Sequence, residues 1–283
     1  MVIWAKNIPY KMCSISHFFG KFANGEGRLR FGKKNEKNHF SFCFALNLHY
    51  LCSLKAKTFI QTKNINNMNK LITLEQAVEK VHDGMTIMFG GFLGVGSATQ
   101  IIDAIVEKGV KDLTIIANDT AYDEVAHGKL VTNHQVKKAI VSHTGTNKQT
   151  ALQKNEGTLI VEYVPQGTLA ERIRAAGAGL GGVLTPTGLG TIMADGKDVI
   201  NIDGNDYLLE KPLRADIAFL RANIVDEFGN MVFLGTTNNF NPLMATAADY
   251  VVVEAEKLVK VGEIKPECVH ASGIYVDGIY VEK

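Results

Sequence analysis

An apolar run that leads into a glycine-rich loop most constrains the fold of this 283-residue chain. Residues 85–89 follow a turn-forming Asp-Gly pair and are almost continuously apolar, as in strands buried on both faces of a parallel sheet. Four of the next seven residues are glycine. Residues 99–108 have apolar side chains at helical spacing and are followed by Gly109, which predicts a helix. Ser97 and Gln100 predict a capping box at its start. The order of strand, loop and helix predicts an α/β domain.

The loop itself, residues 90–96, suits a ligand group that carries negative charge. Glycines lack a Cβ atom and permit positive φ angles, so backbone N–H groups can point at an oxyanion, a thiolate or a phosphate beside the positive end of a helix. Two other interpretations stay open, because glycine turns also serve only to pack a helix onto a sheet, and others bind dinucleotides. The dinucleotide fingerprint requires a third glycine where Thr99 stands, which disfavours that interpretation.

Apolar runs and helical patterns alternate along the rest of the chain. Strands are predicted at residues 113–117, 136–141, 158–163, 215–220 and 250–254, and helices at residues 74–81, 169–176 and 242–248. This alternation predicts a largely parallel sheet with helices on both faces. Asp203-Gly204, between apolar residues 199–202 and 207–209, indicates a hairpin. Antiparallel strands are therefore expected in the second half.

The glycine loop resembles the signature of the family I CoA transferases, which is Asp or Asn, Gly, three hydrophobic residues, Gly-Gly-Phe, three residues and Gly-x-Pro. It departs only at Ala98, which stands where the family has proline. Residues 165–191 and 226–245 are similar to two further landmarks of that family. The resemblance covers residues 68–283 and is closest to the A, or alpha, subunits of the acetate and acetoacetate/butyrate enzymes.

The resemblance implies a fold, a reaction and a partner. The fold is a three-layer αβα domain around an open, mostly parallel sheet with a few antiparallel strands, as in CoA transferases and ribose-5-phosphate isomerase. In the family's ping-pong reaction, a glutamate attacks an acyl-CoA, and CoA passes to a short-chain carboxylate. In two-subunit members that glutamate lies on the B, or beta, subunit, so an A2B2 heteromer is expected and this chain should be inactive alone.

Coenzyme A is then a substrate, with no permanently bound cofactor and no metal. The resemblance makes one continuous segment the expected binding site for CoA and for the thioester oxyanion, namely Gly90, Gly91, Phe92, Leu93, Gly94, Val95 and Gly96.

Polar residues near the ends of predicted strands are further candidates. Gln166 and Asn118 are expected to support the site: both follow predicted strands, where ligands of open α/β sheets bind, and the resemblance favours Gln166. A glutamine that points into solvent is the alternative for Gln166. Asp119 is expected to be a turn residue, and His143 to have a structural or surface role. Glu227 begins a Glu-x-Gly pattern like that of the nucleophile, but its neighbours predict a hairpin turn.

Residues 1–67 differ in composition from residues 68–283. The first segment holds eleven Lys or Arg and two Asp or Glu, a charge of +9, whereas the remainder carries −8. We expect a basic, poorly ordered extension, either translated upstream sequence before Met68 or a genuine appendage. Its longest apolar stretch is shorter than the roughly 20 residues of a membrane span, so no membrane partner is expected. Cys268 alone remains in the second segment, which suits a reducing cytoplasm.

Two other functions are compatible with the predicted fold. A sugar-phosphate isomerase or deaminase would need a catalytic lysine or paired carboxylates near the loop, and neither is recognisable in the sequence. A sugar-responsive transcription regulator would need a helix-turn-helix in residues 1–67. The basic charge fits such a role, but glycines interrupt the segment, so no nucleic-acid partner is expected.

Overall fold

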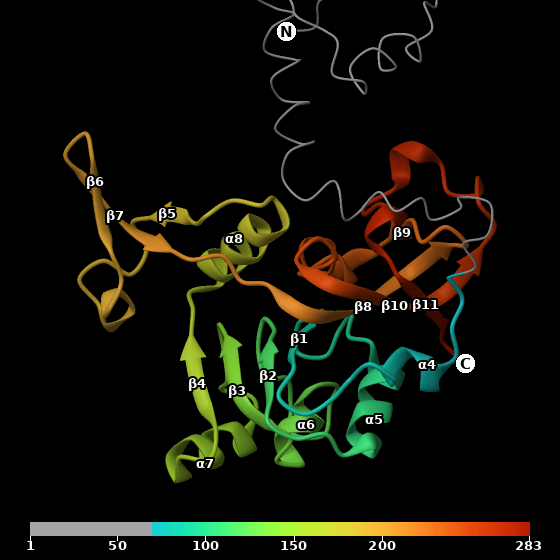
Figure 1. Ribbon diagram of the computed structural model, residues 1–283, viewed down its shortest axis with the longest axis horizontal. Coiled ribbons are helices and arrows are strands. Elements are labelled where there is room, and N and C mark those ends of the chain that lie inside the picture. Colours follow the sequence, from blue (N-terminus) through green and yellow to red (C-terminus); the bar gives the residue numbers. More distant parts are fainter. Residues whose placement is uncertain (1–69) are drawn as a thin grey trace, which may run out of the picture. The chain divides into compact units, whose positions relative to one another are not determined.

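The computed structural model describes residues 70–283, which fold around one large sheet (Figure 1). The predicted boundary between residues 67 and 68 lies outside this part. The strand order is β11-β10-β8-β1-β2-β3-β4, all neighbours in that order are parallel, and β9 pairs antiparallel with β8. The strands are β1 (Thr86–Phe89), β2 (Leu113–Ile116), β3 (Val136–Val141), β4 (Ile160–Tyr163), β8 (Ala215–Asp226), β9 (Met231–Val232), β10 (Ala248–Val259) and β11 (Gly278–Val281).

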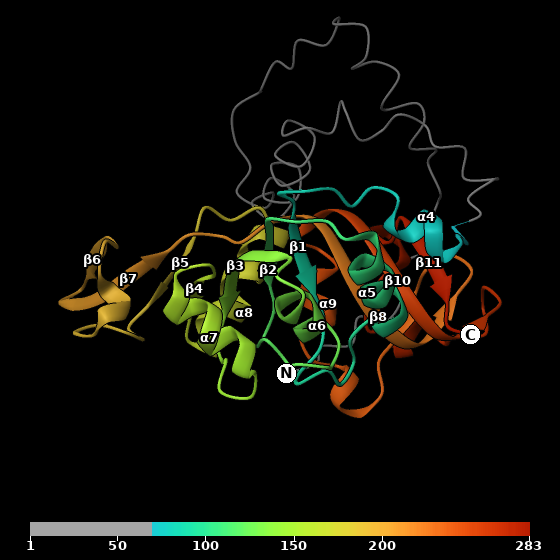
Figure 2. The same cartoon turned by 90° about the horizontal axis from the view of Figure 1, so that it is seen from below.

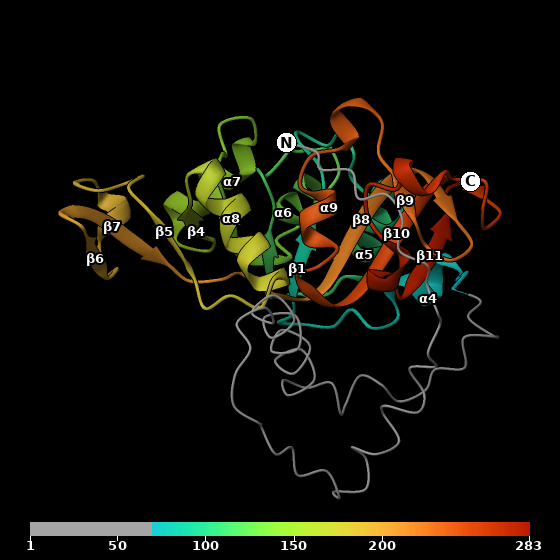
Figure 3. The same ribbon diagram turned by 90° about the horizontal axis from the view of Figure 1, so that it is seen from above.

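Helices cover both faces of this sheet. Ile87 and Ile101 belong to the apolar cluster under α4, α5 and α6. Met88, Leu169 and Met244 belong to the cluster on the other face, under α8 and α9. Figure 2 shows α5, α6 and α7 from their side of the sheet, and Figure 3 shows α8 and α9 from theirs. The helices are α4 (Leu74–Val78), α5 (Thr99–Lys108), α6 (Gly128–Thr132), α7 (Lys148–Glu156), α8 (Gln166–Gly177) and α9 (Asn241–Met244). The predicted three-layer αβα fold is confirmed.

A second, three-stranded sheet is inserted between α8 and β8. It is antiparallel with the order β5-β7-β6, where β5 is Val183–Thr185, β6 is Val199–Ile202 and β7 is Asn205–Glu210. Asp203 and Gly204 form the turn between β6 and β7 with positive φ angles of 51° and 81°, which confirms the predicted hairpin. Short 3-10 turns complete the described chain at Ile192–Ala194, Gly235–Thr237, Pro266–Cys268 and Gly273–Tyr275.

The structure departs from the predicted elements in a few places. The helix predicted at residues 242–248 ends at Met244, because β10 begins at Ala248. Short elements at α6, α7, β9 and β11 were not predicted. Within residues 70–283, no helix has the length and apolar character that a membrane span requires.

The predicted capping box at the start of α5 is wrong. Ser97 donates its hydroxyl hydrogen to Gly90 O (2.9 Å), and the N-cap is Ala98, without a side-chain bond. The free N–H of Ile101 instead donates to Glu254 Oε2 on β10 (2.9 Å). Glu254 is buried, and this burial raises the pKa of its carboxyl to about 7. A side chain 153 residues away thus satisfies the helix start.

We expect the stability of the chain to fall as the pH rises from 4.5 to 7, because of Glu254. In this interval the unfolded chain loses the proton of Glu254 while the folded chain keeps it, which costs the fold about 3 kcal/mol by pH 7. Glu254→Gln should therefore match the wild type at pH 4.5 and exceed its free energy of unfolding above pH 7. Urea unfolding across pH 4.5–8 measures this difference. The control is Glu256→Gln on the same strand, whose side chain is exposed; parallel curves for wild type and Glu254→Gln would contradict the expectation.

Candidate active site

The glycine loop joins β1 to α5 and forms a tight two-residue turn at its tip. The backbones of Phe92 and Val95 exchange two hydrogen bonds of 3.0 and 2.9 Å. Leu93 and Gly94 between them have φ angles of 50° and 90°. Leu93 is a non-glycine residue in the left-handed region, so an interaction must hold it there. That interaction is the bond from the Leu93 N–H to Asp119 Oδ2 (3.0 Å).

The glycines of the loop are required by close packing within the chain. A Cβ atom on Gly90 would lie 1.7 Å from Asn241 Oδ1, and one on Gly91, whose φ is 123°, would lie 2.0 Å from Ser97 Oγ. Gly96 has a φ of 77° and somewhat more space, since a Cβ atom there would lie 2.9 Å from Asn239 Nδ2. These glycines therefore fit the packing interpretation, with asparagine and serine side chains filling the space that a Cβ atom would need.

Two asparagines at the start of α9 hold the loop in this shape: Asn239, two residues before the helix, and Asn241, its first residue. The Gly91 N–H donates to Asn239 Oδ1 (3.0 Å), and Asn239 Nδ2 donates to Val95 O (3.1 Å). Asn241 Nδ2 donates to Gly96 O (2.9 Å). The N–H of Gly94, at the half-exposed tip, has no acceptor anywhere in residues 70–283. Gly94 is thus the exposed loop position that can still donate to a ligand.

Asn118, Asp119 and Gln166 form a hydrogen-bonded chain beside the loop. Gln166 Nε2 donates to Asn118 Oδ1 (2.6 Å), and Asn118 Nδ2 donates to Asp119 Oδ2 (2.7 Å). The same Oδ2 accepts the Leu93 N–H. Asn118 and Asp119 are buried, whereas Gln166 is exposed at the start of α8. Because these residues follow β1, β2 and β4, three parallel strands end at one place.

His127 binds the backbone of Asp119 and so supports these hydrogen-bonded residues. Its Nε2 lies 2.8 Å from the backbone oxygen of Asp119, an atom that only accepts, so this nitrogen carries the proton. Its ring stacks on Phe89 at 5.8 Å. Burial lowers the pKa of His127, so the ring is neutral at neutral pH. Asp119 itself accepts the N–H of Ala121 two residues on, as the expected turn residue does, and it is in addition a buried acceptor for Leu93 and Asn118.

A cavity of about 390 Å³ opens between the loop and the starts of α8 and α9. Phe92 and Gln166 are the predicted site residues that line it. Asn118 does not line the cavity but accepts a hydrogen bond from Gln166. The described residues around this cavity include no Asp, Glu, Lys, Arg or His. They are Phe92, Gln166, Gly167, Ala170, Thr236, Asn238, Asn239, Phe240 and Leu243. The site is thus built from amides and apolar side chains.

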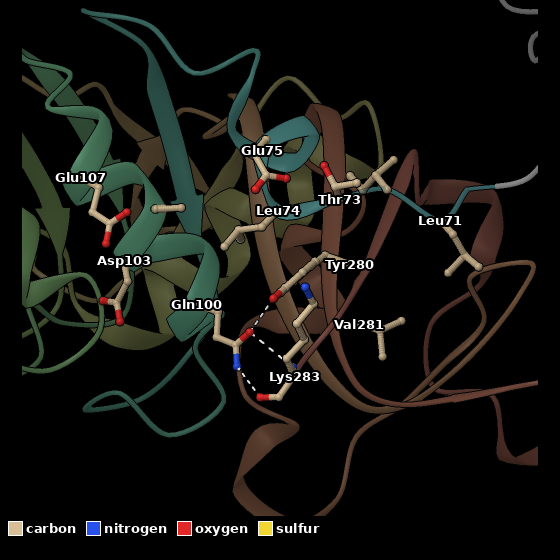
Figure 4. Close-up of a pocket in the computed structure, with 12 residues that line it drawn as sticks. Leu71, Thr73, Leu74, Glu75, Gln100, Asp103, Glu107, Tyr280, Val281 and Lys283 are labelled. Carbon is tan, nitrogen blue, oxygen red and sulfur yellow. Dashed lines mark hydrogen bonds between the residues drawn. The ribbon is translucent and has the colours of Figure 1, made fainter.

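A larger cavity of about 710 Å³ lies elsewhere, between α4, α5 and β11 (Figure 4). None of the predicted site residues lines it. Glu75, Asp103 and Glu107 do, against the cation of Lys283, so the lining carries net negative charge and disfavours an anionic ligand. Gln100, also at this cavity, accepts a hydrogen bond from the Tyr280 hydroxyl and donates to Lys283 O.

The structure also shows where two other candidate residues, Glu227 and His143, lie. Glu227 is exposed in the turn between β8 and β9, and Asp226 accepts the N–H groups of Phe228, Gly229 and Asn230, so the predicted turn is confirmed. His143 is exposed, and no hydrogen bond of its ring occurs within residues 70–283. Neither residue belongs to the cavity.

We expect Asp119→Asn to lower the free energy of unfolding by about 2 kcal/mol. The two carboxylate oxygens of Asp119 accept N–H groups on both sides, from Leu93 and from Ala121, and an amide NH2 on either side would face a donor. Urea unfolding of the chain at constant pH measures this loss. The control is Asp112→Asn, at an exposed position. Equal stability of Asp119→Asn and wild type would show that the carboxylate does not hold the loop.

Comparison with known proteins places these features in one family. The model of the coenzyme A transferase family matches residues 71–282. The chain is 48% identical over 214 residues to the acetate CoA-transferase subunit alpha of Escherichia coli K12, covering 76% of this chain and 97% of the relative. It is 50% identical over 214 residues to the acetoacetyl-CoA:acetate/butyrate CoA transferase alpha subunit of Clostridium acetobutylicum, covering 76% and 98%.

Solved structures show the same fold. An acyl-CoA transferase from Escherichia coli O157:H7, solved as a thioester complex with CoA, superposes with a TM-score of 0.69 at 25% identity. The match covers 77% of this chain and 48% of the other, so this chain spans about half of that enzyme's length. Glutaconate coenzyme A-transferase from Acidaminococcus fermentans superposes with a TM-score of 0.67 at 23% identity, covering 75% of each chain. The chain described here belongs to the coenzyme A transferase family, in which it matches alpha subunits over nearly their full length.

Proposed function

We propose that this chain is the alpha subunit of a heteromeric enzyme that transfers CoA between short-chain acyl groups, and that the beta subunit provides the nucleophilic glutamate. The observation that carries the proposal is the composition of the 390 Å³ cavity, which offers amides but no carboxylate among its described lining residues. A covalent mechanism with a carboxylate nucleophile therefore needs a second chain at this site.

The proposed reaction passes through a mixed anhydride and then a glutamyl-CoA thioester. The partner's carboxylate oxygen attacks the carbonyl carbon of the acyl-CoA, the C–S bond breaks, and CoA leaves as a thiolate from a mixed anhydride. The thiolate then attacks the glutamyl carbonyl and releases the first carboxylate, which leaves a glutamyl-CoA thioester. An acceptor carboxylate reverses these steps. Each attack develops negative charge on a carbonyl oxygen, which neutral N–H donors stabilise.

Gln166, which lines the cavity, is the donor that we assign to this role. Gln166 uses one hydrogen of Nε2 to bind Asn118 and keeps the other for the cavity. The bond to buried Asn118 orients the amide before substrate binds, so little reorganisation is needed. The N–H of Gly94, at the tip of the loop and outside the described cavity lining, is assigned to CoA. In this proposal Gly90, Gly91 and Gly96 shape the loop, and Leu93 and Gly94 form its turn between Phe92 and Val95.

The lining of the cavity favours a short monocarboxylate. Phe92, Ala170, Phe240 and Leu243 offer apolar contacts for an alkyl chain. A dicarboxylate would bury its second charge without a cation from the described lining residues, which is costly. We therefore prefer acetate, butyrate or acetoacetate to succinate as acceptor. The lack of a cation also disfavours a sugar-phosphate isomerase or deaminase, because phosphate would need one.

Three further parts of the proposal concern the whole chain. We assign the catalytic domain to residues 68–283 and a separate extension to residues 1–67, since the family match begins at residue 71. We also propose an A2B2 assembly, and a cytoplasmic location where CoA thioesters are available. Native mass of the purified complex tests the stoichiometry.

The proposal is tested by CoA exchange from acetoacetyl-CoA to acetate, butyrate and succinate. The full chain is assayed alone and after mixing with the beta subunit of the same organism. Transfer is expected only in the mixture, and at least about ten-fold faster to acetate or butyrate than to succinate, as one unpaired buried charge would cause. Activity of the chain alone would contradict the partner nucleophile and favour Glu227. An inactive mixture would contradict the proposed reaction.

Gln166→Ala should lower kcat of the assembled enzyme by about 10² to 10³, the usual effect of removing one oxyanion donor. KM for acyl-CoA should change far less, since the donor acts mainly in the transition state. Steady-state kinetics of the mixture provide both constants. Gln149→Ala on α7, outside the cavity, is the matched control and should behave as wild type. An unchanged kcat in Gln166→Ala would remove this residue from the reaction.

A further inference from the structure

The small sheet of residues 183–210, which we call the arm, stands out beside the large sheet in all three ribbon views (Figures 1, 2 and 3). One face of the arm is covered by its own chain around Leu208, while Val199 at its outer end stays exposed. Leu208 on β7 is fully buried there. The space that a Cβ atom on Gly188 would take lies 2.9 Å from Met193 and 3.4 Å from Leu208, so the segment between β5 and β6 packs onto this face.

The other face of the arm is apolar and open. Strand register places five apolar side chains on it, because directly paired residues and every second residue along a strand share one face. Leu184 pairs with Leu209, and Ile200 pairs with Tyr207. Ile202 follows two residues after Ile200. Leu184, Ile200 and Ile202 are 41%, 38% and 44% exposed.

The arm is a fixed element of the fold and not a loose hairpin. Glu210 at the end of β7 is buried and binds Lys197 Nζ at 2.5 Å. Its other oxygen lies 3.8 Å from Arg172 Nε on α8. Arg172 also donates to Lys211 O (2.8 Å). Charged contacts thus tie the base of the arm to α8, so the apolar face is presented in a set orientation.

An exposed apolar face on a small three-stranded sheet is typical of a protein-binding surface. The acidic residues around the arm indicate the charge that a partner surface must carry. Asp195, Asp198, Asp203 and Asp206 are exposed around it, and its one basic residue, Lys197, is already paired with Glu210. Residues 70–283 carry a charge of −8, so a second copy of this domain would set acidic surface against acidic surface.

We propose that the open face of the arm, made by Leu184, Ile200, Ile202, Tyr207 and Leu209, is a docking surface for the beta subunit. The matching surface is an apolar patch with basic residues at its rim. This inference rests on the proposed function, which requires a second, different chain. It adds a contact that comes from an element outside the candidate active site.

The test compares two neighbouring substitutions on β6 in the full chain. Ile200→Lys places a charge on the open face, whereas Val199→Lys places it on the opposite face of the same strand, at a position that is 52% exposed. Binding to the beta subunit is measured by sedimentation, and circular dichroism verifies the fold of both variants. Ile200→Lys should raise Kd for the beta subunit at least about ten-fold, as loss of a central apolar contact does. Val199→Lys should stay within about two-fold of wild type.

The transfer activity of the Ile200→Lys mixture should return at high protein concentration, because the variant weakens assembly and leaves the site intact. Three results would overturn the inference: an unchanged Kd for Ile200→Lys, an equal loss in Val199→Lys, or loss of self-association of the chain alone with unchanged binding of the beta subunit. If the wild-type mixture assembles without transferring CoA, the proposed function is wrong. The Kd values of the two variants then still show whether the arm binds the beta subunit.

Discussion

The buried carboxylate of Asp119 is the interaction on which the candidate site depends. It holds Leu93 in a left-handed conformation, it accepts from Asn118, and through Asn118 it orients Gln166. One acceptor group therefore connects the ends of three parallel strands. A buried carboxylate is costly unless its oxygens are fully hydrogen-bonded. Here the cost is offset by N–H donors that the loop needs to have satisfied in any case.

The glycine loop combines packing with possible ligand contact, two roles that are usually treated as alternatives. Gly90, Gly91 and Gly96 leave room for asparagine and serine side chains, and those side chains in turn satisfy the backbone groups of the loop. Gly94 is the exposed exception, since its N–H stays unpaired within the described chain. The rigidity that packing provides is what a preorganised donor requires.

Local sequence patterns predicted the helices and strands that have a clear apolar periodicity of their own. The strand at residues 136–141 and the helix at residues 99–108 have the expected bounds, because apolar periodicity alone determines them. α6, α7 and β11 are too short or too polar for such a signal. The capping box failed for another reason: Ser97 had the right spacing, but the N-cap is Ala98, one residue later, and the Ser97 hydroxyl bonds Gly90 O.

The site was predictable in its outline and not in its connections. Gln166 and Asn118 follow predicted strands, where topology and the family resemblance made them candidates, and the structure joins them by a hydrogen bond. Asn239 lay in a block that resembled the family, yet no local pattern says that an amide there contacts Gly91. The loop of residues 90–96 takes its shape from atoms about 145 positions later in the chain. During synthesis on the ribosome, the loop therefore stays without its supports until the start of α9 has emerged, so the candidate site is among the last parts of the domain to form.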